Sequence, residues 1–208
     1  MATNLQFIKS IDANTGASSV SIDNVFNKGY DVYFVTVTGL NISGNRSPYM
    51  RLLDSSGSEI TSSVYDRASL GMFSNSSFGE YRNASSSEWY YIPSLYINDE
   101  LKDSFASFYV FNAEDTNSYT FLTLQGGDYV AHGVGMKTIA VCKQTALHRG
   151  FSFKHGGSEN FTNGNISVEG IKLRMRSIYT SKLVSIEAFN PLLPLLPPPI
   201  ITLATSLD

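Results

Sequence analysis

The chain has 208 residues, of which 16 % are charged and 12 % are aromatic, and its formal net charge is −3. This length suits one substantial domain, and the high aromatic content excludes a solvated disordered polymer. No block of Lys or Arg is present, so we expect no binding to nucleic acid. No apolar run of about eighteen residues and no apolar signal-peptide core are found. We therefore expect a soluble product without membrane insertion.

Alternation of apolar and polar residues with a period of two predicts an all-β fold. In residues 31–38, Tyr33, Val35 and Val37 share one face, and Phe34 and Thr36 share the other. The same pattern predicts about ten short strands, at residues 5–9, 19–22, 31–38, 49–53, 88–95, 105–111, 119–124, 138–141, 151–154 and 166–173. Close spacing of such strands favours an antiparallel β-sandwich, and a jelly-roll-like topology is our first expectation.

Turn residues separate these strands, and three segments between them lead to specific expectations. Gly126-Gly127 has the composition of a turn, and Asn163-Gly164 is expected to close a hairpin between Phe161 and Ile166. Residues 98–104 predict one or two turns of helix, with Asn98 as the N-cap. Residues 54–87 are rich in Ser, Gly, Asn and Tyr and weakly periodic, which predicts a long functional connection.

The composition changes sharply after residue 179, which divides the chain into a sandwich domain, residues 1–179, and a C-terminal arm, residues 180–208. Prolines in the arm exclude a helix or a central strand, so we expect it to run extended. An extended apolar segment has no core of its own, which indicates docking on another chain or along its own sandwich. The expected assembly residues are Pro191, Leu192, Leu193, Pro194, Leu195, Leu196, Pro197, Pro198, Pro199, Ile200 and Ile201.

Side chains that could carry chemistry form no recognised pattern. His132, His148 and His155 are not spaced as metal ligands, and no nucleophile or phosphate-binding motif is present. We therefore expect no catalytic residues, no metal and no cofactor. Cys142 lies in an apolar strand and is expected to be a buried hydrophobe. The neighbouring carboxylates Glu114-Asp115 and Asp99-Glu100 are expected to be solvated loop charges.

Aromatic residues near residues 54–87 form a candidate recognition surface. Aromatic faces beside Asn, Ser and Asp are common in sugar-binding sites, although packing in the core is expected for at least half of such residues. The candidates for contact with a glycan or receptor are Tyr65, Tyr81, Trp89, Tyr90 and Tyr91.

Several motifs resemble those of small virion proteins of tailed bacteriophages, particularly marine ones. The first half carries LQFIK at residues 5–9, VFN and YDVY within residues 25–33, and RLLDSSG at residues 51–57. The second half carries GFSF at residues 150–153 and NFTNGNISVEGI at residues 160–171, similar to a closing NFxxGxIxVxGI hairpin of that group. The resemblance covers residues 5–174 and implies a β-sandwich mounted on the virion, in a tail fibre, a tail appendage or a capsid decoration. It supplies no catalytic residues.

We therefore expect a structural virion component that is not an enzyme. Its expected partners are other virion proteins and copies of itself, and it is expected to assemble through the C-terminal arm. The first alternative is a module for host attachment that binds a cell-surface glycan. The second is a polysaccharide depolymerase, which needs a pair of carboxylates about 5 to 10 Å apart in a cleft.

Overall fold

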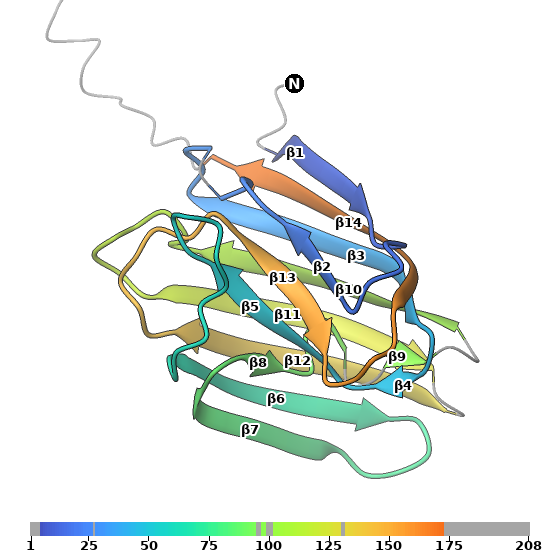
Figure 1. The fold of residues 1–208 in the computed structure, drawn as a ribbon. Coiled ribbons are helices and arrows are strands. Elements are labelled where there is room, and N and C mark those ends of the chain that lie inside the picture. The colour runs from blue at the N-terminus through green and yellow to red at the C-terminus, as the bar shows by residue number, and fades with distance from the viewer. Residues whose placement is uncertain (1–4, 27, 95–96, 99–101, 130–131, 173–208) are drawn as a thin grey trace, which may run out of the picture. The chain divides into compact units, whose positions relative to one another are not determined.

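The computed structural model describes residues 5–26, 28–94, 97–98, 102–129 and 132–172 (Figure 1). This part of the chain is all-β, contains no helix and forms an antiparallel sandwich. Its fourteen strands are β1 (Leu5–Asp12), β2 (Ser19–Ile22), β3 (Val32–Ile42), β4 (Asn45–Arg46), β5 (Pro48–Leu53), β6 (Tyr65–Phe73), β7 (Gly79–Ser86), β8 (Trp89–Tyr90), β9 (Ile97–Asn98), β10 (Lys102–Phe111), β11 (Thr120–Tyr129), β12 (Gly133–Cys142), β13 (Gly150–His155) and β14 (Phe161–Ile171).

Two sheets of unequal width face each other in Figure 1. The large sheet has eight strands in the order β1-β14-β3-β10-β11-β12-β6-β7. The small sheet has four strands in the order β2-β13-β5-β8, and β4 pairs with β9 in a separate two-stranded sheet. The small sheet therefore covers only part of the inner face of the large one. Residues 88–95 contribute only the two-residue strand β8 to it, and the Ile92–Pro93 peptide bond that follows is cis.

The order of the strands is that of a jelly roll with two additions. In a jelly roll the chain passes between two sheets so that the first strand pairs with the last. Here β2 pairs with β13, β13 with β5 and β5 with β8, while β3, β6 and β7 occupy the other sheet. The three-stranded meander β10-β11-β12 stands where a jelly roll has one strand, and β1 and β14 extend the sheet beside β3. The jelly-roll-like sandwich expected from the sequence is confirmed.

Alternation along the strands builds the core between the sheets. Tyr33, Val35 and Val37 of β3 are buried, as their spacing predicted. Phe151 and Phe153 of β13 meet them from the small sheet, and Phe108 of β10 lies edge-on to Phe151 with ring centroids 5.7 Å apart. Cys142 is also fully buried, and this burial raises the pKa of its thiol to about 11. The prediction that Cys142 is a packed hydrophobe is confirmed.

The predicted helix at residues 98–104 is wrong for the residues that the structure describes there. Asn98 ends strand β9, and residues 102–104 begin β10. Ser104 is buried, and its hydroxyl donates to the carbonyl oxygen of Leu40 at 2.9 Å. Pairing of Asn98 with Asn45 of β4, and of Ser104 with Leu40 of β3, therefore overrides the local capping preference of Asn98.

The long connection expected at residues 54–87 is also wrong, because it contains the hairpin of β6 and β7. The inward positions of β6 include Arg67 and Ser69, which are polar but buried. Arg67 donates to the Ser69 hydroxyl at 2.8 Å, and this hydroxyl contacts that of Thr138 at 2.8 Å. Hydrogen-bonded polar groups thus occupy inward positions at which the period-two pattern requires apolar residues. For this reason the pattern did not predict strand β6.

A Gly-Gly pair and an Asn-Gly pair that were expected to form turns lie inside strands. Gly126 is in β11, where a Cβ atom would lie 2.6 Å from the carbonyl oxygen of Pro93, so its side of the strand accommodates the segment after β8. Asn163 and Gly164 lie within β14, where pairing with β3 shifts in register and Gly164 has φ of +130°. The positive φ serves a β-bulge and not a hairpin. The expected hairpin between Phe161 and Ile166 is therefore wrong.

The predicted C-terminal arm, residues 180–208, lies outside the described residues. The last described strand, β14, ends at Ile171.

Candidate interaction surface

The outer face of the large sheet carries an unusual number of exposed apolar side chains. In an antiparallel sandwich this face is commonly solvated and polar. Here Ile139 of β12 is 67 % exposed, Phe121 of β11 is 42 % exposed and Tyr109 of β10 is 41 % exposed. All three point away from the core because their neighbours Ala140, Leu122 and Val110 point into it.

Strand pairing aligns these side chains in two adjacent rows across the sheet, which together we call the apolar band. Within a row, each residue is the register partner of the next one on the neighbouring strand. A strand that contributes to both rows does so with two residues that are two positions apart, because these point to the same face. The first row contains Phe34, Tyr109, Thr123, Ile139 and Ala68. The second row contains Leu5, Ile171, Val32, Phe111, Phe121 and Val141.

Polar groups limit the band on one side. The row beyond Phe34 and Tyr109 is polar from β14 to β12, where it contains Ser167, Thr36, Ser107, Gln125 and Lys137, and it ends at the apolar Leu70 of β6. Within the band the rings are packed together, since the centroids of Phe34 and Tyr109 are 4.8 Å apart. The apolar band is thus one contiguous stripe with a polar border.

Two hollows indent the band where its side chains are small. The first, of about 600 Å³, is lined by Ala68, Thr123, Tyr109 and Ile139, among others. The second, of about 590 Å³, is lined by Ala68, Ile139 and Phe121 and extends towards β7. Because Ile139 and Ala68 line both, the hollows adjoin over β12 and β6. Such a surface can bury apolar side chains of another protein segment.

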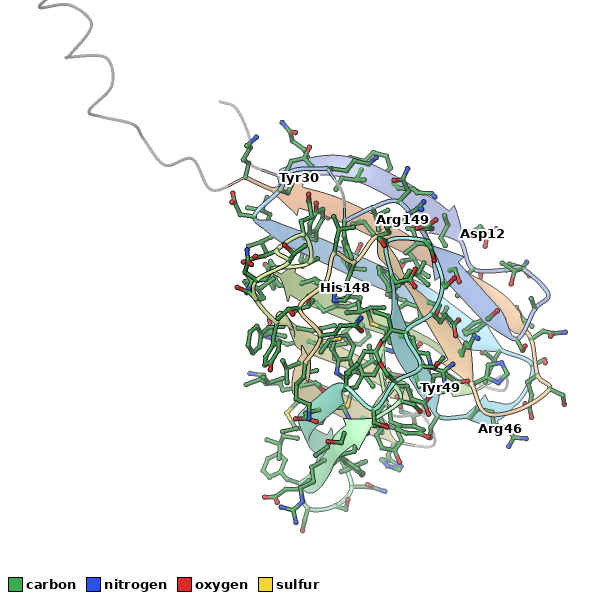
Figure 2. All side chains as sticks on the ribbon, turned by 60° about the vertical axis from the view of Figure 1, so that its left-hand side comes forward. Asp12, Tyr30, Arg46, Tyr49, His148 and Arg149 are labelled. Atoms are coloured by element: carbon green, nitrogen blue, oxygen red, sulfur yellow. The ribbon has the colours of Figure 1, made fainter. Side chains whose placement is uncertain are left out.

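The outer face of the small sheet is built from charges. Arg51 of β5 donates to Glu59 at 3.0 Å and also to Glu88, and Lys154 of β13 donates to Glu59 at 2.7 Å. Burial works against the charges of Arg51 and Glu59, but their hydrogen bonds outweigh it: the pKa of Arg51 is raised and that of Glu59 is lowered. Tyr49, labelled in Figure 2, lies with its ring centroid 5.3 Å from the Arg51 guanidinium.

The five aromatic residues predicted for glycan contact do not form one surface, and two of them are in the core. Tyr65 and Trp89 are fully buried and lie edge to face with ring centroids 5.0 Å apart. Tyr65 accepts from the amide of Leu52 at 3.0 Å, and Trp89 donates to the carbonyl of Asp66 at 3.1 Å. Including them in a contact surface was wrong, because their polar atoms are satisfied inside the sandwich.

The other three aromatic residues are neighbours at the turn after β8, where the ring centroids of Tyr90 and Tyr91 are 6.4 Å apart, but they differ in exposure. Tyr81 and Tyr91 are partly buried against each other, with centroids 5.4 Å apart, and Arg67 lies over the Tyr91 ring at 5.0 Å. Tyr90 is 41 % exposed and lies 6.0 Å from Tyr49 on the outer face of the small sheet. Only Tyr90 therefore retains the exposure that a contact residue needs.

The carboxylates considered for chemistry have structural partners where they are described. Glu114 accepts from the backbone amide of Gly29 at 2.9 Å and from the Tyr33 hydroxyl, so it ties two loops together. Asp99 and Glu100 lie outside the described residues. Glu59 and Glu88 both bind Arg51, but the lowered pKa of Glu59 is the opposite of what a glycosidase general acid requires.

The histidines also lack a common site. His148 is fully buried, neither of its ring nitrogens has a hydrogen-bond partner among the described residues, and burial lowers its pKa to about 4. His155 packs edge-on to Phe161, and His132 lies beside Phe73. In the described ranges no three His, Cys, Asp or Glu side chains gather as a metal site would require.

Sequence reasoning missed the apolar band, although a signal was present. In residues 105–111 and 119–124, and at Ile139-Ala140-Val141, both strand faces carry apolar side chains. Strands that are apolar on both faces are typical of a sheet covered on both sides. The alternation was interpreted only for the inward face.

Among the described residues there is no helix with the length and apolar character needed to cross a membrane. No family model, no curated protein and no solved structure matches this chain. The resemblance to phage virion proteins therefore stays a prediction that rests on the motifs quoted above.

Proposed function

We propose that the chain is a non-enzymatic structural component of a tailed phage virion, in a tail fibre, a tail appendage or a capsid decoration. The observation that carries the proposal is the apolar band on the outer face of the large sheet. A monomer gains nothing from Ile139, Phe121 and Tyr109 in water, whereas a subunit of an assembly buries them. The jelly roll is shared by viral capsid proteins and lectin domains, which is an analogy at the level of the fold alone.

The expected partners are copies of the same chain, together with other virion proteins. Exposed apolar area contributes about 25 cal/mol per Å² when it is removed from water, so a continuous stripe across seven strands provides a substantial driving force for association. Most soluble homo-oligomers are closed and symmetric, which brings the same surface of each copy into contact. A polar border of the kind described is typical of the rim of an interface.

The test is the molar mass of the full chain in solution, measured by light scattering after size exclusion from about 1 to 100 µM. We expect an oligomer for the unchanged chain. Ile139→Glu places an unpaired charge in the interface and is expected to raise the dissociation constant about 100-fold or more. The matched control Ser21→Glu adds the same charge to the exposed outer face of β2 and should leave the mass unchanged. A monomeric unchanged chain over the whole range would contradict self-assembly.

The location on a virion needs a separate measurement. Mass spectrometry of gradient-purified particles of the phage that encodes the chain is expected to detect it at a fixed number of copies per particle. Peptides found in the lysate but absent from the particles would rule out a virion component, whatever the mass in solution.

The second candidate function is recognition of a host cell-surface glycan, and one observation favours it. Tyr90 and Tyr49 present neighbouring rings beside Arg51 and Glu88 on the small sheet, and a hydrogen bond to Glu88 raises the pKa of Tyr90. Aromatic faces beside charged hydrogen-bonding groups suit sugar rings. A glycan array with the purified chain tests this idea, with Tyr90→Ala as the variant and Tyr119→Ala, at a similarly exposed loop position, as the control. Equal signals from both variants would rule out this site.

A further inference from the structure

We propose that the hollows of the apolar band receive the Pro-Leu-Leu segment, residues 191–199, of a second copy of this chain. This inference rests on the proposed function, in which copies assemble with one another. It adds the occupant of the surface and the way in which the occupant lies on it.

The segment has a sequence repeat that suits a groove. Residues 191–199 read Pro-Leu-Leu, Pro-Leu-Leu, Pro-Pro-Pro, so proline recurs at every third position. A polyproline II helix has three residues per turn, and proline favours it. In that conformation the first residues of the triplets share one edge of the rod. Leu192 and Leu195 then share a second edge, and Leu193 and Leu196 share the third.

The spacing of the leucines matches the spacing of the hollows. Residues three apart in polyproline II are about 9.3 Å apart, because each residue rises about 3.1 Å. In the first row of the band, large and small side chains alternate from strand to strand: Tyr109, Thr123, Ile139 and Ala68. The small positions, Thr123 and Ala68, lie two strands apart, which is about 9.6 Å. A rod crossing the strands therefore places one leucine over Thr123 and the next over Ala68, on either side of Ile139.

The surroundings of the hollows also suit this occupant. Grooves that bind polyproline segments are lined by aromatic side chains, and here Tyr109 and Phe121 flank the hollows. The backbone of a polyproline II helix makes no internal hydrogen bonds, so its carbonyls need donors. Gln125, Lys137 and Arg82 line the same hollows and supply side-chain donors.

The length of chain before the segment favours a second copy over the same copy. Residues 173–190, eighteen residues, connect the end of β14 to Pro191. From β14 to β12 is four strand spacings, or about 19 Å, and eighteen extended residues reach about 60 Å. The connection is about three times longer than docking on its own sheet requires, whereas a bridge to a neighbour needs such a reach.

A cysteine cross-link in the full chain tests the proposal. One differently tagged chain carries Ala68→Cys and the other carries Leu195→Cys; the native Cys142 is buried and keeps its thiol protonated. Under mild oxidation we expect a disulfide between the two chains. In the control pair Ser21→Cys, on the opposite outer face, replaces Ala68→Cys, and cross-linking is expected to fall at least tenfold.

Three outcomes would overturn the inference. Dimers linked through Ala68→Cys on both chains would show face-to-face packing of two sheets. A double variant, Ala68→Cys with Leu195→Cys, that closes within one chain at high dilution would show docking in the same copy. Absence of any excess over the Ser21→Cys control would show that the segment does not reach the band.

A mass measurement separates failure of this inference from failure of the proposed function. Leu192→Ser with Leu195→Ser is expected to weaken self-association at least tenfold. If this variant keeps the wild-type mass while Ile139→Glu is monomeric, the band assembles the chain but the Pro-Leu-Leu segment is not its occupant. If the unchanged chain is itself monomeric, the proposed self-assembly fails first.

Discussion

The two outer faces of the sandwich differ in kind, although the same strand alternation produces both. On the small sheet the outward positions hold Ser21, Ser152, Arg51 and Lys154, and their charges are paired with Glu59 and Glu88. On the large sheet the outward positions hold the apolar band. The first face is satisfied within one chain and the second is not, so the first is suited to stabilise the monomer and the second to bind a partner.

The largest difference is expected when the central cation of the small face is removed. Arg51→Met leaves Glu88, whose side chain is only 8 % exposed, without its cation. Breaking one partner of a largely buried pair should lower the free energy of unfolding by about 3 kcal/mol. Arg82→Met, at an exposed position on the large face, should change it by less than about 0.5 kcal/mol. Urea denaturation of both variants measures this, and equal losses would remove the distinction between the faces.

Acid should affect the stability of the chain without affecting the apolar band. Burial lowers the pKa of His148 from about 6.5 to about 4 in the folded state, with Asp54 opposing this shift, so the unfolded state binds the proton more readily. Stability is then complete above pH 6.5 and declines as the pH falls towards 4, by about 3 kcal/mol from this residue. His155 is shifted in the same direction, also by burial, with Glu159 opposing.

Thermal unfolding between pH 4 and pH 7 measures the loss, and His148→Leu should flatten the profile. The band contains no group that titrates in this range, so the molar mass should stay constant until unfolding begins. Dissociation of a folded oligomer in mild acid would mean that the small face, and not the band, holds the copies together.

Salt should produce the smallest effect, and it should weaken the small face without weakening contacts made by the apolar band. At 1 M ionic strength charges are screened beyond about 3 Å, which weakens the ion pairs of Arg51, Glu59 and Lys154. The Ile139→Glu variant is expected to be monomeric, so its unfolding in urea reports on the ion pairs without a contribution from assembly. Its free energy of unfolding should fall by less than about 1 kcal/mol. Self-association of the unchanged chain should not weaken under the same conditions, as sedimentation velocity can verify. Dissociation in high salt would indicate an electrostatic interface.

The sequence predicted the architecture better than the surface. Period-two patterns in β3, β10 and β13 are strong because large apolar residues such as Val35, Phe108 and Phe153 recur at their inward positions, and those strands were found. The strand β6 was missed because Arg67 and Ser69 occupy its inward positions, where only hydrogen bonds formed in three dimensions make them acceptable. Gly126 and Gly164 resemble turn residues in sequence, but close approach and a bulge explain them in space.

The candidate site was out of reach for a related reason. Tyr65 and Trp89 have the composition of a sugar-binding surface, yet only the fold places both inside the sandwich. The apolar band is made of residues from seven strands, which are far apart in the sequence and are brought into rows by register alone. The arm residues, 191–201, lie outside the described part of the chain, so their role stays a prediction.

The pairing of β1 with β14 has a mechanical consequence. Leu5, at the start of β1, is the register partner of Ile171, at the end of β14, and β14 also pairs along its length with β3. A force that pulls β14 along its axis, away from the rest of the sheet, loads the hydrogen bonds to both neighbours together. A force that pulls Leu5 and Ile171 apart opens the β1–β14 pairs one after another, which requires much less. The domain would therefore resist force best if it were attached through the face of the large sheet and the load were applied to β14 along its axis.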